Sequence, residues 1–163
     1  MKINYINIQG CLLAKYNNEN LNHYINQAEQ TFNLTISDIK NACIEGYNAI
    51  LACDRKKVIG IITYTMGNQK QEIIDIAVDN QYKEENILDD LVNQAIYDLK
   101  NEQPIINIPI TELELFKNII EKYHWQKTSY TESFTTPKGM YGFNEFKLEN
   151  KKNLSPQKKK YYQ

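Results

Sequence analysis

Apolar and polar residues alternate along this chain in two periods, and together they predict a mixed sheet with helices on its faces. Apolar residues that alternate with polar ones, or that form short unbroken runs, predict strands, whereas apolar residues at helical spacing predict helices. The predicted strands are residues 2–8, 48–53, 58–66, 71–78, 105–110, 126–136 and 141–148. The predicted helices are residues 19–32, 36–46, 87–99 and 111–123. The resulting order, β-α-α-β-β-β-α-β-α-β-β, indicates an α/β fold of the α+β mixed-sheet type.

The stretch from Ile73 to Leu99 is the most informative part of this pattern. A buried apolar run passes through a polar loop, residues 79–86, directly into an amphipathic helix. A strand that enters a helix in this way leaves unpaired N–H groups in the first helical turn, where they can bind an anion. The rest of the chain is interpreted as support for this turn.

A carboxylate interrupts the apolar strand of this stretch. Asp75 lies among aliphatic residues, where a charge is costly unless it is paired or faces a wet cleft. Alternation places Asp75 and Ala77 on one face of the strand, and on the other face Ile74, Ile76 and Val78. Asp75 is therefore either a functional residue or an outward-facing side chain of an ordinary strand.

Charge and composition exclude several classes of protein. The formal net charge is −1 and Arg55 is the only arginine, so we expect no nucleic-acid partner. The three cysteines, Cys11, Cys43 and Cys53, lack metal-ligand spacing, so no metal is expected. His23 and His124 have no recognisable partner for catalysis and are interpreted as structural.

The length and the two ends of the chain predict one soluble domain. Residues 1–149 are expected to form a single domain, and the lysine-rich residues 150–163 a flexible tail. The N-terminal residues lack the apolar core of a signal peptide, and no segment is apolar enough to cross a membrane. We therefore expect a cytoplasmic protein without a membrane partner.

Two segments of the chain resemble the GNAT superfamily of acyl-CoA-dependent N-acyltransferases. Residues 76–83, IAVDNQYK, match the end of that family's central strand and the approach to its pyrophosphate loop. Residues 120–125, IEKYHW, resemble the family's Tyr-Glu-Lys-Leu-Gly-Phe segment at the end of its late helix. With the element order, the resemblance covers roughly residues 2–149. It implies a GNAT-like fold, acetyl-CoA or another acyl-CoA as co-substrate, and acyl transfer to an amine.

The resemblance also implies which residues would bind the acyl-CoA. In that family the central strand and the next strand part, and the pantetheine arm lies in the gap against the strand backbone. The matching backbone positions are Ile76, Ala77 and Val78. The positions that match the pyrophosphate site are Lys83, Asn86, Ile87 and Leu88. Pro109 has no N–H to donate and so fits on the partner strand beside such a gap.

Two residues are candidates for catalysis. The family often has an acidic residue on the central strand, so Asp75 is the proposed base, acting on the amine through water. Ile120 stands where the family often has a tyrosine general acid, so Tyr123, one helical turn further on, is the candidate acid. The acceptor, a small-molecule or peptide amine, and a homodimeric assembly are both left open by the sequence.

The loop before the central helix has a second interpretation. Asn86 and Leu88 stand where the family has its two motif glycines. Glu84 and Glu85 complement the helix dipole without any ligand, and Asn86 can cap the helix by accepting from the Asp89 N–H. In this interpretation the turn satisfies its own donors, and the fold is a ligand-binding or protein-interaction module without catalysis.

Overall fold

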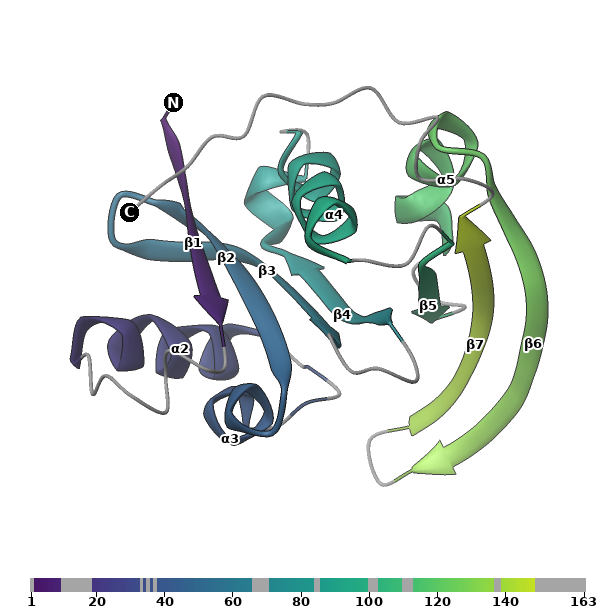
Figure 1. Cartoon of the computed structure of the whole chain (residues 1–163). Helices are drawn as coiled ribbons and strands as arrows, with labels where there is room; N and C mark the ends of the chain where they lie inside the picture. The colour runs from purple at the N-terminus through teal and green to yellow at the C-terminus, as the bar shows by residue number, and fades with distance from the viewer. Residues whose placement is uncertain are drawn as a thin grey trace.

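The protein, described from a computed structural model, forms a seven-stranded mixed sheet with helices on both faces (Figure 1). The structure describes residues 2–9, 19–32, 34, 36, 38–65, 71–83, 86–99, 103–109, 113–136 and 139–148. The strands within them are β1 (Ile3–Gln9), β2 (Tyr47–Asp54), β3 (Lys57–Thr65), β4 (Glu72–Val78), β5 (Ile105–Pro109), β6 (Trp125–Thr136) and β7 (Gly139–Leu148). The helices are α2 (Glu19–Thr31), α3 (Ile39–Ile44), the short 3-10 helix η1 (Asn80–Tyr82), α4 (Ile87–Asp98) and α5 (Leu113–Lys122).

The order of strands and helices predicted from the sequence is confirmed. The element boundaries differ only slightly from the predicted ones. The first strand runs from Ile3 to Gln9, and β6 begins at Trp125. Helix α3 is shorter than predicted because Asp38 caps it, accepting from the Asn41 N–H at 2.9 Å. The predicted tail, residues 150–163, lies outside the described residues, and so do Glu84 and Glu85 of the loop before α4.

The strands follow the order β1-β2-β3-β4-β5-β7-β6 across the sheet. All neighbouring strands are antiparallel except β4 and β5, which are parallel. The parallel pair is joined through α4, because parallel neighbours need a long crossover connection, usually a helix. None of the helices in the described part of the chain is long and apolar enough to span a membrane.

Two apolar cores lie on the two faces of the sheet. Helices α2 and α3 cover one face of the β1–β3 region, and α4 and α5 lie on the opposite face (Figure 1). Both helix layers pack by the stripes that the sequence pattern indicates, for example Leu91, Val92 and Ala95 of α4, which are fully buried. The long strands β7 and β6 form the edge of the sheet beyond β5 and are curved (Figure 1).

Helix α4 approaches β3 closely at Gly60. A Cβ atom at this position would lie 3.2 Å from the Ile87 Cγ2 and Leu91 Cδ1 atoms and 3.3 Å from the Ala77 carbonyl oxygen. These distances are shorter than ordinary van der Waals contacts, so glycine allows the first turns of α4 to lie directly on β3. This contact fixes where the N-terminus of α4 stands relative to the end of β4.

Candidate active site

The strands β4 and β5 part soon after they begin. They are paired at only two positions, Glu72 with Ile105 and Ile73 with Ile106. Beyond this point β5 pairs only with β7 among the described residues, as far as Pro109 opposite Phe143. The parting of β4 and β5 that was predicted beside Val78 is therefore present in the backbone pairing, with Pro109 on the β5 side, and is called the opening below.

An irregularity in β4 lies where the two strands part. Along β3, Thr63 is opposite Asp75 and Tyr64 is opposite Ile73, so Ile74 is an extra residue on β4. Such a β-bulge bends its strand and increases the local twist. The bulge therefore accounts for the direction in which β4 leaves β5.

The bulge also corrects the predicted faces of β4. Ile76 lies on the α4 side and Ala77 on the α2–α3 side, as alternation predicts, but Ile73 and not Ile74 joins the α4-side core. A single extra residue moves the side chain of every residue before it to the opposite face of the strand, which regular alternation does not predict. Ile74 is half-buried and is not part of either core among the described residues.

Burial along β4 is consistent with a missing neighbour. Residues 58–64 of β3 are all buried, as expected for a strand inside a sheet that is covered on both faces. In β4 only Ile73 and Val78 are buried, although the strand also lies inside the sheet, and residues 74–77 are half-buried. The backbone of Ile76, Ala77 and Val78 thus borders the opening.

The segment after β4 is held against the β2–β3 hairpin. The Asp79 N–H donates to the Ile59 carbonyl at 2.8 Å, and the Asp79 carboxylate accepts from the Lys57 ammonium at 2.8 Å and from the Gln81 N–H at 3.0 Å. These hydrogen bonds lower the pKa of Asp79 below its ordinary value, with that from Lys57 the largest cause.

The Tyr82 hydroxyl donates to Asp54 at 3.1 Å. The chain is therefore anchored directly before Lys83, whose side chain is exposed.

The first helical hydrogen bond of α4 shows which of its backbone donors have no partner within the helix. The first helical hydrogen bond runs from the Asp90 N–H to the Asn86 carbonyl at 2.9 Å, so the amides of Ile87, Leu88 and Asp89 have no carbonyl partner within the helix. Among the described residues the Asn86 side chain makes no capping hydrogen bond. The predicted bond from the Asp89 N–H to Asn86 is therefore absent among the described residues, while Glu84 and Glu85, the other part of the self-capped interpretation, lie outside them.

The two residues at the family's glycine positions adopt ordinary conformations. Asn86 has φ −74° and ψ 25°, so this position needs no residue that tolerates positive φ. Leu88 is half-buried and packs against the α4-side core. Both substitutions are thus compatible with the turn as it is folded here.

Side chains at the start of α4 connect it to the end of α5. The Asp89 carboxylate accepts from the Lys122 ammonium and from the Tyr123 hydroxyl, both at 2.5 Å, and Asn93 donates to the Tyr123 oxygen at 2.6 Å. Because α4 packs on β4 and α5 packs on β5, this cluster bridges the two sides of the opening. The other first-turn carboxylate, Asp90, accepts from the Tyr5 hydroxyl at 2.7 Å.

The comparisons with known proteins settle the fold. No protein-family model and no curated protein matches the sequence significantly. Solved structures do match: an acetyltransferase of the GNAT family from Streptococcus pneumoniae has a TM-score of 0.61 at 11% identity, over 90% of this chain and 98% of that one. The ribosomal-protein-S18-alanine N-acetyltransferase from Escherichia coli has a TM-score of 0.63 at 12% identity, over 99% of both chains. Arabidopsis thaliana NAA60, solved in complex with acetyl-CoA, has a TM-score of 0.62 at 11% identity, over 90% of this chain and 97% of that one.

This chain has the GNAT fold. At these identities the likeness establishes the architecture alone.

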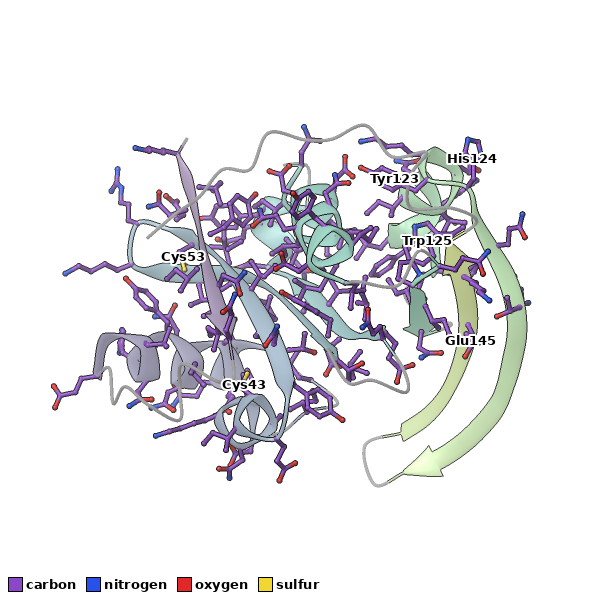
Figure 2. All side chains as sticks on the ribbon, viewed as in Figure 1. Cys43, Cys53, Tyr123, His124, Trp125 and Glu145 are labelled. Carbon is purple, nitrogen blue, oxygen red and sulfur yellow. The ribbon has the colours of Figure 1, made fainter. Side chains whose placement is uncertain are left out.

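The end of α5 agrees with the GNAT resemblance of residues 120–125. The helix ends at Lys122, and His124 has a φ of 56°, in the left-handed region, at the position where the family segment has glycine. Histidine adopts this region more readily than most residues. Trp125 follows as a buried aromatic at the family's phenylalanine position, and Figure 2 shows these residues where α5 passes into β6.

The two candidate catalytic residues lie on opposite faces of the GNAT sheet. Tyr123 is half-buried beside α4, and burial together with its hydrogen bond to Asp89 raises the pKa of its hydroxyl. Asp75 is on the α2–α3 face, where its carboxylate accepts from the Ile36 N–H at 3.1 Å. Asp75 therefore holds the segment before α3 against β4, and the structure does not bring it together with Tyr123.

Two charged residues at the opening were missed by the sequence analysis. Asp89 and Lys122 are 33 positions apart, so nothing in the local pattern signals that they pair. The cysteines with described positions are unsuited to nucleophilic chemistry, because burial raises the pKa of Cys43 to about 12 and of Cys53 to about 11. His23 and His124 are both exposed, and neither has a described catalytic partner.

Proposed function

We propose that this protein is an acyl-CoA-dependent N-acyltransferase that uses acetyl-CoA as its donor and an amine as its acceptor. The observation that carries the proposal is the parted β4–β5 pair, whose opening leads to backbone amides at the start of α4. An extended thioester arm needs such a slot with unpaired backbone groups, and a diphosphate needs such donors. The GNAT fold supports the same assignment, since its solved members include acetyltransferases.

In this proposal the residues of the site divide the acyl-CoA between them. The backbone of Ile76, Ala77 and Val78 pairs with the pantetheine arm. The amides of Ile87 and Leu88 bind the pyrophosphate, with Asn86 at the edge and Lys83 supplying a positive charge. Lys122 offsets the negative charge of Asp89 beside this site, which lowers the repulsion that a diphosphate would meet.

The proposed reaction is direct attack of the amine on the thioester carbonyl. A C–N bond forms, the C–S bond breaks, the amine loses a proton and the departing thiolate gains one. Asp75, acting through water, is the proposed acceptor of the first proton, and Tyr123 the proposed donor of the second. Alignment of the two reactants supplies much of the rate in such a mechanism, through an effective molarity of roughly 10⁵ M or more.

The donor site is tested by titrating the protein with acetyl-CoA and following its thermal unfolding. A ligand at 100 times its dissociation constant adds about 2.7 kcal/mol, which is several degrees for a domain of this length. An Asn86→Asp substitution keeps the size of the side chain and favours the helix N-terminus, but it places a carboxylate beside the diphosphate. We expect unchanged or higher stability without ligand and roughly tenfold weaker binding of acetyl-CoA.

A charge control separates this effect from a change in net charge. Gln30→Glu adds the same charge at an exposed position of α2, on the other face of the sheet, and should bind acetyl-CoA like the wild type. If millimolar acetyl-CoA gives no shift in the wild type, the donor assignment is wrong.

Catalysis is tested by following the release of free CoA thiol with a panel of small-molecule and peptide amines. Release that depends on the amine supports the transferase. The alternative function, a module that binds acyl-CoA without chemistry, is favoured by Ile120 at the family's tyrosine position and by the engagement of the Tyr123 hydroxyl with Asp89. Binding without thiol release for every amine would support that alternative.

A further inference from the structure

A buried hydroxyl lies opposite the bulge of β4. Thr63 of β3 is 1% exposed and is the one residue of polar, non-aromatic type that is buried among the described residues. Its oxygen accepts a hydrogen bond from the Asp75 N–H at 3.2 Å. On the other side of the bulge the Thr65 oxygen accepts from the Glu72 N–H at 3.1 Å. Two threonine hydroxyls of β3 therefore bind backbone groups of β4 on either side of Ile74.

The position of Thr63 gives the hydroxyl a specific task. A buried hydroxyl is costly unless it is hydrogen-bonded, and valine has the same shape and suits a buried strand at least as well. An inserted residue disrupts the regular ladder locally, so the Asp75 N–H gains a fixed partner from Thr63 where the ladder is irregular. The hydroxyl thus stabilises the bulged conformation against a regular one.

The bulge lies between the end of the β4–β5 ladder and Asp75. The β4–β5 ladder ends at Ile73, the residue directly before the extra one. Asp75, the residue directly after it, faces α3 and binds the Ile36 N–H. A regular strand would reverse the faces of Ile73 and the residues before it, and it would extend towards β5 without the bend.

We propose that Thr63 is a positioning residue of the acyl-transfer site: its hydroxyl, bound to the Asp75 N–H, holds the bulge that parts β4 from β5. This inference rests on the proposed function for its effect on acetyl-CoA, while its structural part stands on the hydrogen bond alone.

The test compares Thr63→Val, which removes the acceptor at constant shape, with Thr63→Ser, which keeps it. Ile25→Val in α2 is the matched control, because it trims a fully buried side chain in the core on the same face of the sheet without touching β4. Amide hydrogen exchange at Asp75 reports the bulge, and steady-state kinetics or equilibrium binding report the affinity for acetyl-CoA. In the wild type the Asp75 amide should be protected from exchange, a measurement that needs no variant.

For Thr63→Val we expect exchange at Asp75 to rise roughly tenfold or more above the change in the rest of the sheet, because a part-buried N–H loses this acceptor. The KM or dissociation constant for acetyl-CoA should rise by a similar factor, and Thr63→Ser should restore both. Ile25→Val should change exchange uniformly and leave the affinity unchanged.

Three results would overturn the inference. They are an unprotected Asp75 amide in the wild type, exchange in Thr63→Val that rises no more at Asp75 than elsewhere, and faster exchange at Asp75 with unaltered affinity for acetyl-CoA. If the wild type itself fails to bind acetyl-CoA, the proposed function is wrong, and the exchange data alone then decide whether Thr63 holds the bulge.

Discussion

The strand β4 has two neighbours, and it meets them in different ways. Towards β3 it is paired from Gly60 opposite Val78 down to Tyr64 opposite Ile73, and α4 presses on that pair at Gly60. Towards β5 it is paired at two positions only. The β3 side of β4, called the closed seam below, is thus paired along most of its length. The β5 side, called the open seam, is paired only at its start.

This comparison teaches that the opening does not arise from a lack of apolar residues. Ile74, Ile76 and Ala77 of β4 are as apolar as the residues of β3, yet they are half-buried. What differs is the neighbouring strand: β5 turns to β7, and the bulge at Ile74 directs β4 away from it. A surface that a sheet would normally bury is thereby left half-buried.

The largest expected effect comes from two adjacent isoleucines. Ile73→Ala should lower the free energy of unfolding by about 2–5 kcal/mol, because Ile73 is fully buried in the α4-side core. Ile74→Ala should cost about 1 kcal/mol or less, because Ile74 is half-buried and outside both cores. Urea unfolding of the two variants measures both. Equal losses would mean that β4 is regular and that the bulge is not at Ile74.

A glycine of the closed seam gives the next largest effect. Gly60→Val places branched carbon atoms against Ile87 and Leu91, and overpacking of this kind costs about 1–3 kcal/mol. Gly60→Ala should cost less, since its Cβ meets mostly the ends of flexible side chains. Both variants should also weaken the binding of acetyl-CoA in the same order, because the first turn of α4 must move. Unaltered unfolding of Gly60→Val would show that α4 does not lie this close to β3.

The closed seam and the open one differ also in how far the sequence predicts them. Periodicity in residues 73–99 predicts a strand, a loop and an amphipathic helix because burial on one face leaves a repeating pattern. Pro109 pointed correctly to a strand with one unpaired side, since the lack of an N–H is visible in the sequence. Features of this local kind were predicted well.

Neither the bulge in β4 nor the hydrogen bond between Asp89 and Tyr123 could be predicted from the sequence. An extra residue in β4 is defined only by its register with β3, and the residues IID show no glycine or other sign of it. Asp89 and Tyr123 come together only because α4 and α5 are packed on neighbouring strands. Contacts between distant segments depend on the whole sheet, whereas capping and periodicity depend on a few neighbouring residues.

Removing a single oxygen atom should weaken the hydrogen-bond cluster that joins α4 to the end of α5. Tyr123→Phe removes the hydroxyl that joins Asp89 and Asn93 and should lower the free energy of unfolding by about 0.5–1.5 kcal/mol. If Tyr123 is the general acid, kcat should also fall, and the wild type should lose activity only above the ordinary tyrosine pKa of 10.0, because its own pKa is raised. Asn93→Ala is the control, since it loosens the same cluster but keeps the hydroxyl. An equal kcat in Tyr123→Phe and Asn93→Ala would remove Tyr123 from the proposed chemistry.

The smallest expected effect concerns the anchor between the two seams, where Asp79 holds the segment after β4 to Lys57. The folded-state pKa of Asp79 is lowered, so its contribution to stability is complete above its ordinary pKa of 3.8 and is lost as the pH falls through the folded-state value. Asp79→Asn should therefore be less stable than the wild type at pH 5 and above, and the difference should shrink below about pH 3.8. Because the Lys57 side chain is half exposed, the difference should be small and should diminish further at high salt. Urea unfolding from pH 2.5 to pH 7 measures it, and a difference that grows towards low pH would mean that Asp79 is not paired in the folded state.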